Sequence, residues 1–156
     1  MFHSKIKEIH NKWLNSYEFL EVKAENTSGG ILTFWNPNKI DILDVEASRE
    51  YLSVVIQPVG DKETYLLTNF YGPQILEDKL KFLDSLESLR DRHSGIPWIL
   101  GGDFNMINSL LEKKGGTRVL NKDSLKFQTF IDTMRLVDIV TGNGIFTWNN
   151  KRGGES

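Results

Sequence analysis

The stretch "PWILGGDFNMI", residues 97–107, decides the fold, because an apolar run there leads directly into glycines and then polar residues. Side chains alternate between the two faces of an extended chain. This alternation predicts that Asp103 and Asn105 share one face, while Phe104 points into a core. Ligand sites in α/β sheets favour the carboxyl ends of strands. The stretch therefore indicates a strand that ends at a candidate site.

The residue types at this strand end allow two interpretations. A carboxylate such as Asp103 could orient and deprotonate a water for hydrolysis of a phosphate ester. The amide of Asn105 could donate to a phosphoryl oxygen as charge develops there. Gly101 and Gly102 lack β-carbons, so backbone or ligand could come close. The same letters are also ordinary turn chemistry, in which Asx side chains bond nearby backbone. Taken alone, the stretch favours the turn and leaves catalysis open.

Hydrophobic patterns on either side of this stretch predict a mixture of strands and helices. Strands are expected at 19–22, 28–36, 39–45, 51–59, 64–71 and 98–100, with a hairpin turn at "GDK" (60–62). Helices are expected at 4–15, 75–93 and 123–136, with a loop at 108–122 and a short final strand after the turn at 142–144. The last helix should bury Leu125, Phe127, Phe130, Ile131 and Met134. Hairpins mixed with β-α-β units predict a mixed-sheet α/β sandwich rather than a purely parallel fold.

Composition restricts the class of protein. The chain has 156 residues, 39% of them apolar and 26% charged, which is typical of one soluble globular domain of ordinary size. It contains no cysteine, which excludes a disulfide partner and a thiolate metal site and fits a reducing compartment. We see neither a secretory signal nor an apolar run long enough to cross a membrane. The net charge of −2 means that any nucleic-acid binding must come from a local patch.

Four blocks of sequence, in the same order along the chain, resemble one known family. "WILGGDFNMI" (98–107) resembles the Gly-Asp-x-Asn strand of the endonuclease/exonuclease/phosphatase family, which are metal-dependent phosphoesterases. "SGGILTFWNP" (28–37), "LLTNFYGP" (66–73) and "LVDIVTGNGIFTWNNKRGG" (136–154) resemble its Gly-Gly strand, its tyrosine strand and the segment ahead of its last strands. "SGGILTFWNP" and "LEKKGGTR" (111–118) resemble the version found in plant LINE-type (non-LTR) retroelements.

The resemblance implies roles for particular residues. The family's active-site aspartate falls on Asp103, which would orient or activate the attacking water. Its asparagine falls on Asn105, which would contact the scissile phosphate. Its tyrosine falls on Tyr71, which would hydrogen-bond the phosphate or stabilise the leaving group. Trp148 matches an aromatic residue near the DNA-facing surface. Without the resemblance, Tyr71 is better interpreted as a half-buried aromatic at a strand end, and a core position for Trp148 is equally consistent.

The resemblance also implies a fold, and it implies that two strands of that fold are missing from this chain. We expect a partial four-layer α/β sandwich, in which helices flank two mixed β-sheets, formed by one incomplete domain over residues 1–156. It would lack the N-terminal strand that carries the glutamate ligand of Mg²⁺ and the C-terminal strand that carries the catalytic histidine. His3, His10 and His93 do not match that histidine. Since Asp103 is the only matched carboxylate and contributes only indirectly to metal binding, we expect weak or no activity from this chain alone.

Three functional hypotheses are consistent with these features. The first is a fragment of a Mg²⁺-dependent DNA endonuclease of retroelement type, intracellular and nuclear if it acts as the family does. The second is a non-catalytic remnant that binds nucleic acid or a protein, and the third, which the retroelement-like blocks disfavour, is an enzyme for a small phosphate ester. Basic residues after the Asp103 strand could contact DNA phosphates or form only a solvated face. They are Lys113, Lys114, Arg118, Lys122 and Lys126.

Overall fold

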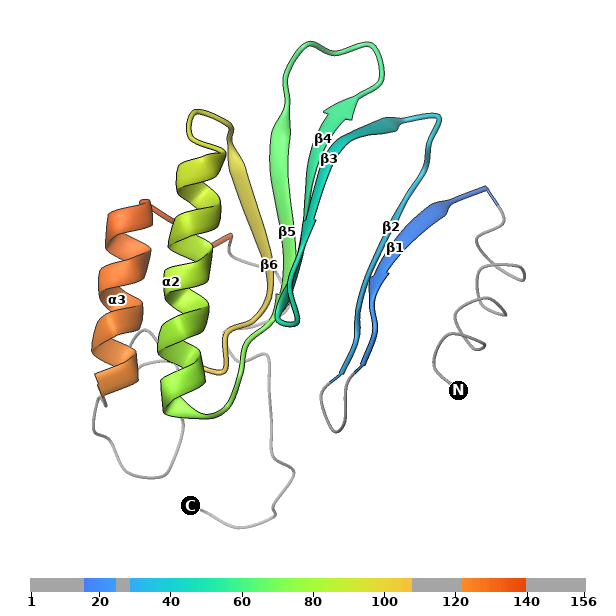
Figure 1. Ribbon diagram of the computed structural model, residues 1–156. Helices are drawn as coiled ribbons and strands as arrows, with labels where there is room; N and C mark the ends of the chain where they lie inside the picture. Colours follow the sequence, from blue (N-terminus) through green and yellow to red (C-terminus); the bar gives the residue numbers. More distant parts are fainter. Residues whose placement is uncertain (1–15, 25–28, 108–121, 140–156) are drawn as a thin grey trace.

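The computed structural model describes residues 16–24, 29–107 and 122–139 (Figure 1). Its elements are β1 (Glu18–Val22), β2 (Ile31–Trp35), β3 (Ile40–Ala47), β4 (Tyr51–Pro58), β5 (Tyr65–Tyr71), α2 (Leu76–Arg92), β6 (Trp98–Asp103) and α3 (Lys122–Met134). These bounds confirm the predicted strands and helices within this part of the chain. The helix expected at 4–15 and the final strand lie outside the described residues. Neither described helix is long and apolar enough to span a membrane.

The described elements form layers (Figure 1). Strands β3, β4, β5 and β6 make one sheet in that order, antiparallel except for the parallel pair β5–β6. Helices α2 and α3 cover one face of this sheet, and the antiparallel pair β1–β2 lies across its other face. The mixed α/β sandwich is thus confirmed. Among the described strands only the larger sheet is mixed, and the predicted first helix, which would add a layer, is outside the described ranges.

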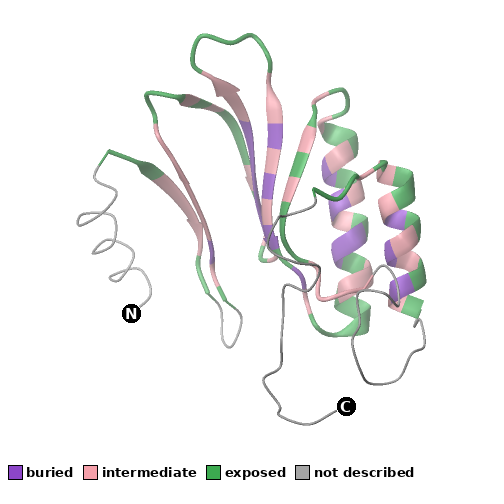
Figure 2. Cartoon of the chain, turned by 180° about the vertical axis from the view of Figure 1, so that it is seen from behind, coloured by how far each residue is buried: buried purple, intermediate pink, exposed green. Residues whose placement is uncertain are grey.

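The main core lies between the larger sheet and the two helices (Figure 2). Alternate residues of the strands point to this side, as expected for a sheet with one face against helices. Leu83, Leu86, Leu89 and Phe130 are fully buried on the helices that face them. One predicted core residue is wrong, because Leu125 is 55% exposed. The buried stripe of α3 runs instead through Ser124, Phe127 and Phe130, at the three-residue spacing of one helix face.

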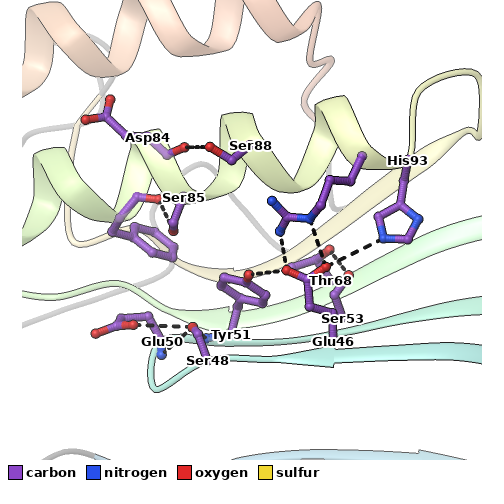
Figure 3. A network of polar contacts seen from close by, with 12 residues as sticks. Glu46, Ser48, Glu50, Tyr51, Ser53, Thr68, Asp84, Ser85, Ser88 and His93 are labelled. Atoms are coloured by element: carbon purple, nitrogen blue, oxygen red, sulfur yellow. Dashed lines mark hydrogen bonds and ion pairs between the residues drawn. The ribbon is translucent and has the colours of Figure 1, made fainter.

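A polar cluster joins β3 and β4 to the end of α2. The Glu46 carboxylate accepts hydrogen bonds from the Tyr51 hydroxyl, at 2.8 Å, and from the Arg92 guanidinium, and His93 Nε2 lies 3.8 Å away (Figure 3). Burial raises the pKa of Tyr51 to about 12, and the hydrogen bond to Glu46 adds to the shift. For Glu46, burial raises the pKa, but the hydrogen bonds from Arg92 and Tyr51 outweigh it, so the pKa is lowered.

This cluster predicts an acid-dependent contribution to stability. Because folding lowers the pKa of Glu46, its contribution is present above the ordinary carboxyl value of 4.5 and is lost as the pH falls below it. We expect the melting temperature of Glu46→Gln to depend less on pH than that of the unmodified chain between neutral and acidic solution. Thermal unfolding followed by circular dichroism at a series of pH values tests this. Parallel pH profiles for the two proteins would contradict it.

Candidate active site

The parallel pairing of β5 with β6 brings two of the predicted site residues together. Tyr71 and Asp103 are register partners, each the last residue of its strand. Register partners on adjacent parallel strands lie about 5 Å apart and point to the same face of the sheet. The two side chains therefore stand side by side at the carboxyl edge, where α/β sheets place ligand sites. Both residues are exposed, Tyr71 to 42%.

This pair lies on the face of the sheet that looks toward β1 and β2. Phe70 packs into the helix-side core, so its neighbours Asn69 and Tyr71 point the other way. The Asn69 amide donates from there to the backbone oxygen of Leu32 in β2, at 3.0 Å. On the helix side, Trp98 Nε1 donates to Thr68 Oγ1 at 2.9 Å, which fixes the start of β6. The candidate site is therefore at one end of the space between the two sheets.

The geometry of Asp103 and Asn105 corrects the prediction of a shared extended face. Strand β6 ends at Asp103, and Asn105 has a φ of 53°, in the left-handed region. The Asn105 backbone N–H donates to Asp103 Oδ1 at 2.8 Å, which is an Asx turn. Its side-chain amide donates to the backbone oxygen of Gly72, at 2.5 Å. The two polar residues are close together because the chain turns, not because it stays extended.

The two glycines have different roles, and both lie inside β6 rather than after it. A β-carbon on Gly102 would come within 2.1 Å of the Phe70 backbone oxygen, so this position must be glycine for β6 to pack on β5. A β-carbon on Gly101 would meet no described atom within 4 Å. The predicted close approach of backbone is therefore confirmed at Gly102. Gly101 leaves open space on the face that carries Asp103.

Phe104 holds the turn against the core, as predicted. Its ring centroid lies 4.3 Å from that of Phe70 and 4.6 Å from that of Phe127, with Phe130 at 6.1 Å. The separations from Phe127 and Phe130 are typical of attractive aromatic pairs, and the Phe70 ring is slightly closer. Because Phe104 stands between Asp103 and Asn105 in the chain, its anchoring in the core restricts the backbone of both. The site turn is therefore attached to the helices as well as to β5.

This arrangement could support water-mediated hydrolysis of a phosphate ester. In the Asx turn, Asp103 Oδ1 accepts the hydrogen bond from the Asn105 backbone N–H, so the other carboxylate oxygen is available to orient a water. Tyr71 is exposed at the adjacent strand end on the same face, and its hydroxyl can donate to a phosphoryl oxygen. The Asn105 amide carries two N–H groups, one of which is used by Gly72.

The described residues do not form a Mg²⁺ site by themselves. Mg²⁺ in proteins takes one or two carboxylates together with substrate phosphate and water. At this strand end Asp103 is the only predicted carboxylate, and among residues 16–24, 29–107 and 122–139 no group of three or more His, Cys, Asp or Glu side chains could hold a metal.

The predicted DNA contacts fall mostly on other parts of the chain. Lys113, Lys114, Arg118 and Trp148 lie outside the described residues. Lys126 is described, and its ammonium pairs with Asp84 at 3.3 Å and Glu87 at 3.7 Å on α2. Its charge is thus directed at the neighbouring helix.

Sequence reasoning missed Gly72 and Asn69. Gly72 donates its N–H to the Asp103 backbone oxygen at 2.7 Å and accepts from Asn105, so it joins the two strand ends. A β-carbon on Gly72 would lie 2.6 Å from the Phe104 backbone oxygen. The letters "YGP" (71–73) mark a strand end where a glycine permits a close approach, and that signal could have indicated Gly72. Nothing in the sequence indicated that Asn69 would reach β2.

Comparison with known proteins defines the class of fold. No protein-family profile matches the sequence, and no curated protein matches it. Solved structures do. An endonuclease/exonuclease/phosphatase from Bacteroides vulgatus matches with a TM-score of 0.53 and 14% identity over 66% of this chain. A family protein from Bacteroides thetaiotaomicron matches with a TM-score of 0.52 and 15% identity over 65% of this chain. A mannosyl-6-phosphatase from the same organism matches with a TM-score of 0.50 and 18% identity over 67%.

These likenesses establish the fold and nothing finer. The structural neighbours are endonuclease/exonuclease/phosphatase family proteins, so the chain has part of that α/β sandwich, as the four sequence blocks implied. The chain spans about half the length of the structures it matches, 45% of one and 48% of the other two. The finer resemblance to plant LINE-type retroelements, the substrate and the metal remain predictions.

Proposed function

We propose that this chain carries one part of the active site of a metal-dependent phosphodiesterase that hydrolyses DNA, of the plant LINE-type retroelement class. The observation that carries the proposal is the placement of Tyr71, Asp103 and Asn105 around the ends of β5 and β6. Tyr71 is far from the other two residues in sequence, and it meets them where this fold class places ligands. The DNA substrate and the retroelement class rest on the resemblance of "SGGILTFWNP" (28–37) and "LEKKGGTR" (111–118) to plant LINE-type retroelements.

In this proposal each side chain has a distinct task. Asp103 orients the attacking water and accepts its proton through the carboxylate oxygen that the Asx turn leaves available. Tyr71 donates its hydroxyl hydrogen to a phosphoryl oxygen or stabilises the leaving oxygen. Mg²⁺, which the resemblance implies for the intact site, would need carboxylate ligands that the described residues do not supply. Lys113, Lys114, Arg118 and Trp148 are proposed to contact the DNA.

The second candidate is a non-catalytic remnant that binds nucleic acid or a protein through the same surface. The Asx turn favours it, because the hydrogen bond from Asn105 N–H to Asp103 Oδ1 has an ordinary structural role. Both candidates share the binding surface. They differ in whether the Asp103 carboxylate is needed for bond cleavage.

Nicking of supercoiled plasmid tests the proposal. We expect the purified chain to nick DNA slowly or not at all with Mg²⁺, since a missing ligand or acid costs about tenfold in rate for each 1.4 kcal/mol of lost transition-state stabilisation. Any cleavage should disappear in Asp103→Ala and persist in Asp132→Ala, which changes an exposed aspartate on α3. Robust nicking that Asp103→Ala abolishes would contradict the expected low activity but support the site. A nicking rate that Asp103→Ala leaves unchanged would contradict the proposed catalytic role of this site.

DNA binding is tested separately by fluorescence anisotropy of a labelled duplex at increasing salt. If Lys113, Lys114 and Arg118 contact phosphates, affinity should fall as salt rises, with a log–log slope of about −0.9 for each contact. Replacing all three by alanine should reduce that slope. An affinity that does not depend on salt would exclude phosphate contacts.

A further inference from the structure

Asn105 is the residue with the most unusual backbone at the candidate site. Its φ of 53° lies in the left-handed region, which few residues other than glycine adopt and which asparagine tolerates best. This conformation turns the chain back just after β6. It directs the Asn105 backbone N–H to Asp103 Oδ1 and its side-chain amide to the Gly72 oxygen.

Gly72 is held on both sides by these strand-end contacts. Its N–H donates to the backbone oxygen of Asp103 at 2.7 Å, and its oxygen accepts from the Asn105 amide. Gly72 directly follows Tyr71, so these bonds restrict the backbone from which the phenol ring projects. These hydrogen bonds form a closed ring of Gly72, Asn105 and Asp103, and Tyr71 is bonded to it through the Gly72 backbone.

The ring has little room to adjust. A β-carbon on Gly72 would meet the backbone oxygen of Phe104 at 2.6 Å, so the ends of β5 and β6 are in direct contact. Aromatic contacts hold Phe104 in the core at the same time. Because Phe104 is packed in the core and cannot shift easily, a change at Asn105 has to alter the position of the β5 end relative to the β6 end.

We propose that Asn105 is a positioning residue, whose amide clips Gly72 to the β6 end and thereby sets where the Tyr71 ring lies relative to the Asp103 carboxylate. The inference rests on the proposed function only in taking Tyr71 and Asp103 as the working pair. It differs from the role that the family resemblance implies for Asn105, which is direct contact with the scissile phosphate. The two roles can be distinguished, because the hydrogen bond from the Asn105 amide to Gly72 forms without substrate, whereas contact with the scissile phosphate requires it.

The test uses carbon-13 NMR of the tyrosine rings in the free chain, with no substrate. As the pH is lowered from neutral into the acid range, the Tyr71 ring resonance should show an inflection that Asp103→Asn removes. Asn105→Gly keeps the backbone N–H and suits the left-handed φ, but it lacks the amide. It should lose most of the inflection, and Asn105→Asp, which places a carboxylate oxygen against the Gly72 oxygen, should lose it too.

Arg135→Gly is the matched control. Arg135 has the same φ of 53° but lies after α3, so the substitution relieves the same backbone strain away from the clip and should leave the inflection unchanged. A full-sized inflection in Asn105→Gly would overturn the proposal, as would its absence from the unmodified chain. If Asn105 instead binds phosphate directly, Asn105→Gly would abolish shifts caused by inorganic phosphate while the inflection persists. A failure of plasmid nicking leaves this measurement unaffected, so the two proposals can fail independently.

Discussion

Gly102→Ala is expected to lose at least about 3 kcal/mol of unfolding free energy, whereas Gly101→Ala should change it by less than about 0.5 kcal/mol. The new methyl group at Gly102 would lie 2.1 Å from the Phe70 backbone oxygen and 2.9 Å from its ring. Backbone cannot move aside as a flexible side chain can, so β6 would have to separate from β5. At Gly101 the methyl group would project into open space among the described atoms.

Urea denaturation of both variants measures this difference, with equal m-values required for the comparison. Since a domain of this size is typically stable by about 5–15 kcal/mol, a loss of about 3 kcal/mol should leave Gly102→Ala folded in water, with a clearly lower urea midpoint. Gly102→Ala could also fail to fold, in which case it would show no cooperative urea transition. A normal transition for Gly101→Ala would then support the same difference between the two positions. Equal midpoints for the two variants would contradict the parallel register of β5 and β6.

The sequence predicted the elements well because their signals are local. The leucine spacing of α2 and the turn between β4 and β5 are complete within their own segments. Leu125 shows where this fails. It is apolar, yet it lies off the stripe that Ser124, Phe127 and Phe130 present to the core. Periodicity shows that a helix has an apolar face. Whether Ser124 or its neighbour Leu125 is buried, however, depends on how α3 packs against α2.

The sequence named candidate site residues but did not predict their geometry. Asp103 and Asn105 were expected on one face of an extended strand. The alternation rule stops at the residue where pairing with β5 stops, and no local pattern placed that limit at Asp103. The contact that fixes Asn105 comes from Gly72, 33 residues earlier in the chain. A contact between such distant segments depends on strand order and register, which only the assembled sheet determines.

Phe104→Ala is expected to lose about 3 kcal/mol of unfolding free energy, near the lower end for truncation of a core phenylalanine because the residue is only partly buried. Its ring contacts Phe70 of the sheet and Phe127 of α3, with centroids 4.3 Å and 4.6 Å away. Removing it takes away apolar burial together with these two contacts and the more distant ring contacts to Phe82 and Phe130. Phe104→Leu, which keeps most of the volume, should lose only about 1 kcal/mol.

Phe104→Ala should also loosen the candidate site, because the ring anchors the turn between Asp103 and Asn105. The amide hydrogen of Gly72 reports this, since it donates to the Asp103 backbone oxygen across the two strand ends. Its hydrogen exchange should accelerate in Phe104→Ala by more than the global loss of stability explains, while amides in the middle of β4 change only with global stability. Leu125→Ala, on the exposed side of α3, is the control and should alter neither quantity. If hydrogen exchange accelerates by the same factor at the Gly72 amide and at the β4 amides, then Phe104 stabilises only the fold as a whole. The turn would in that case be held by its own hydrogen bonds.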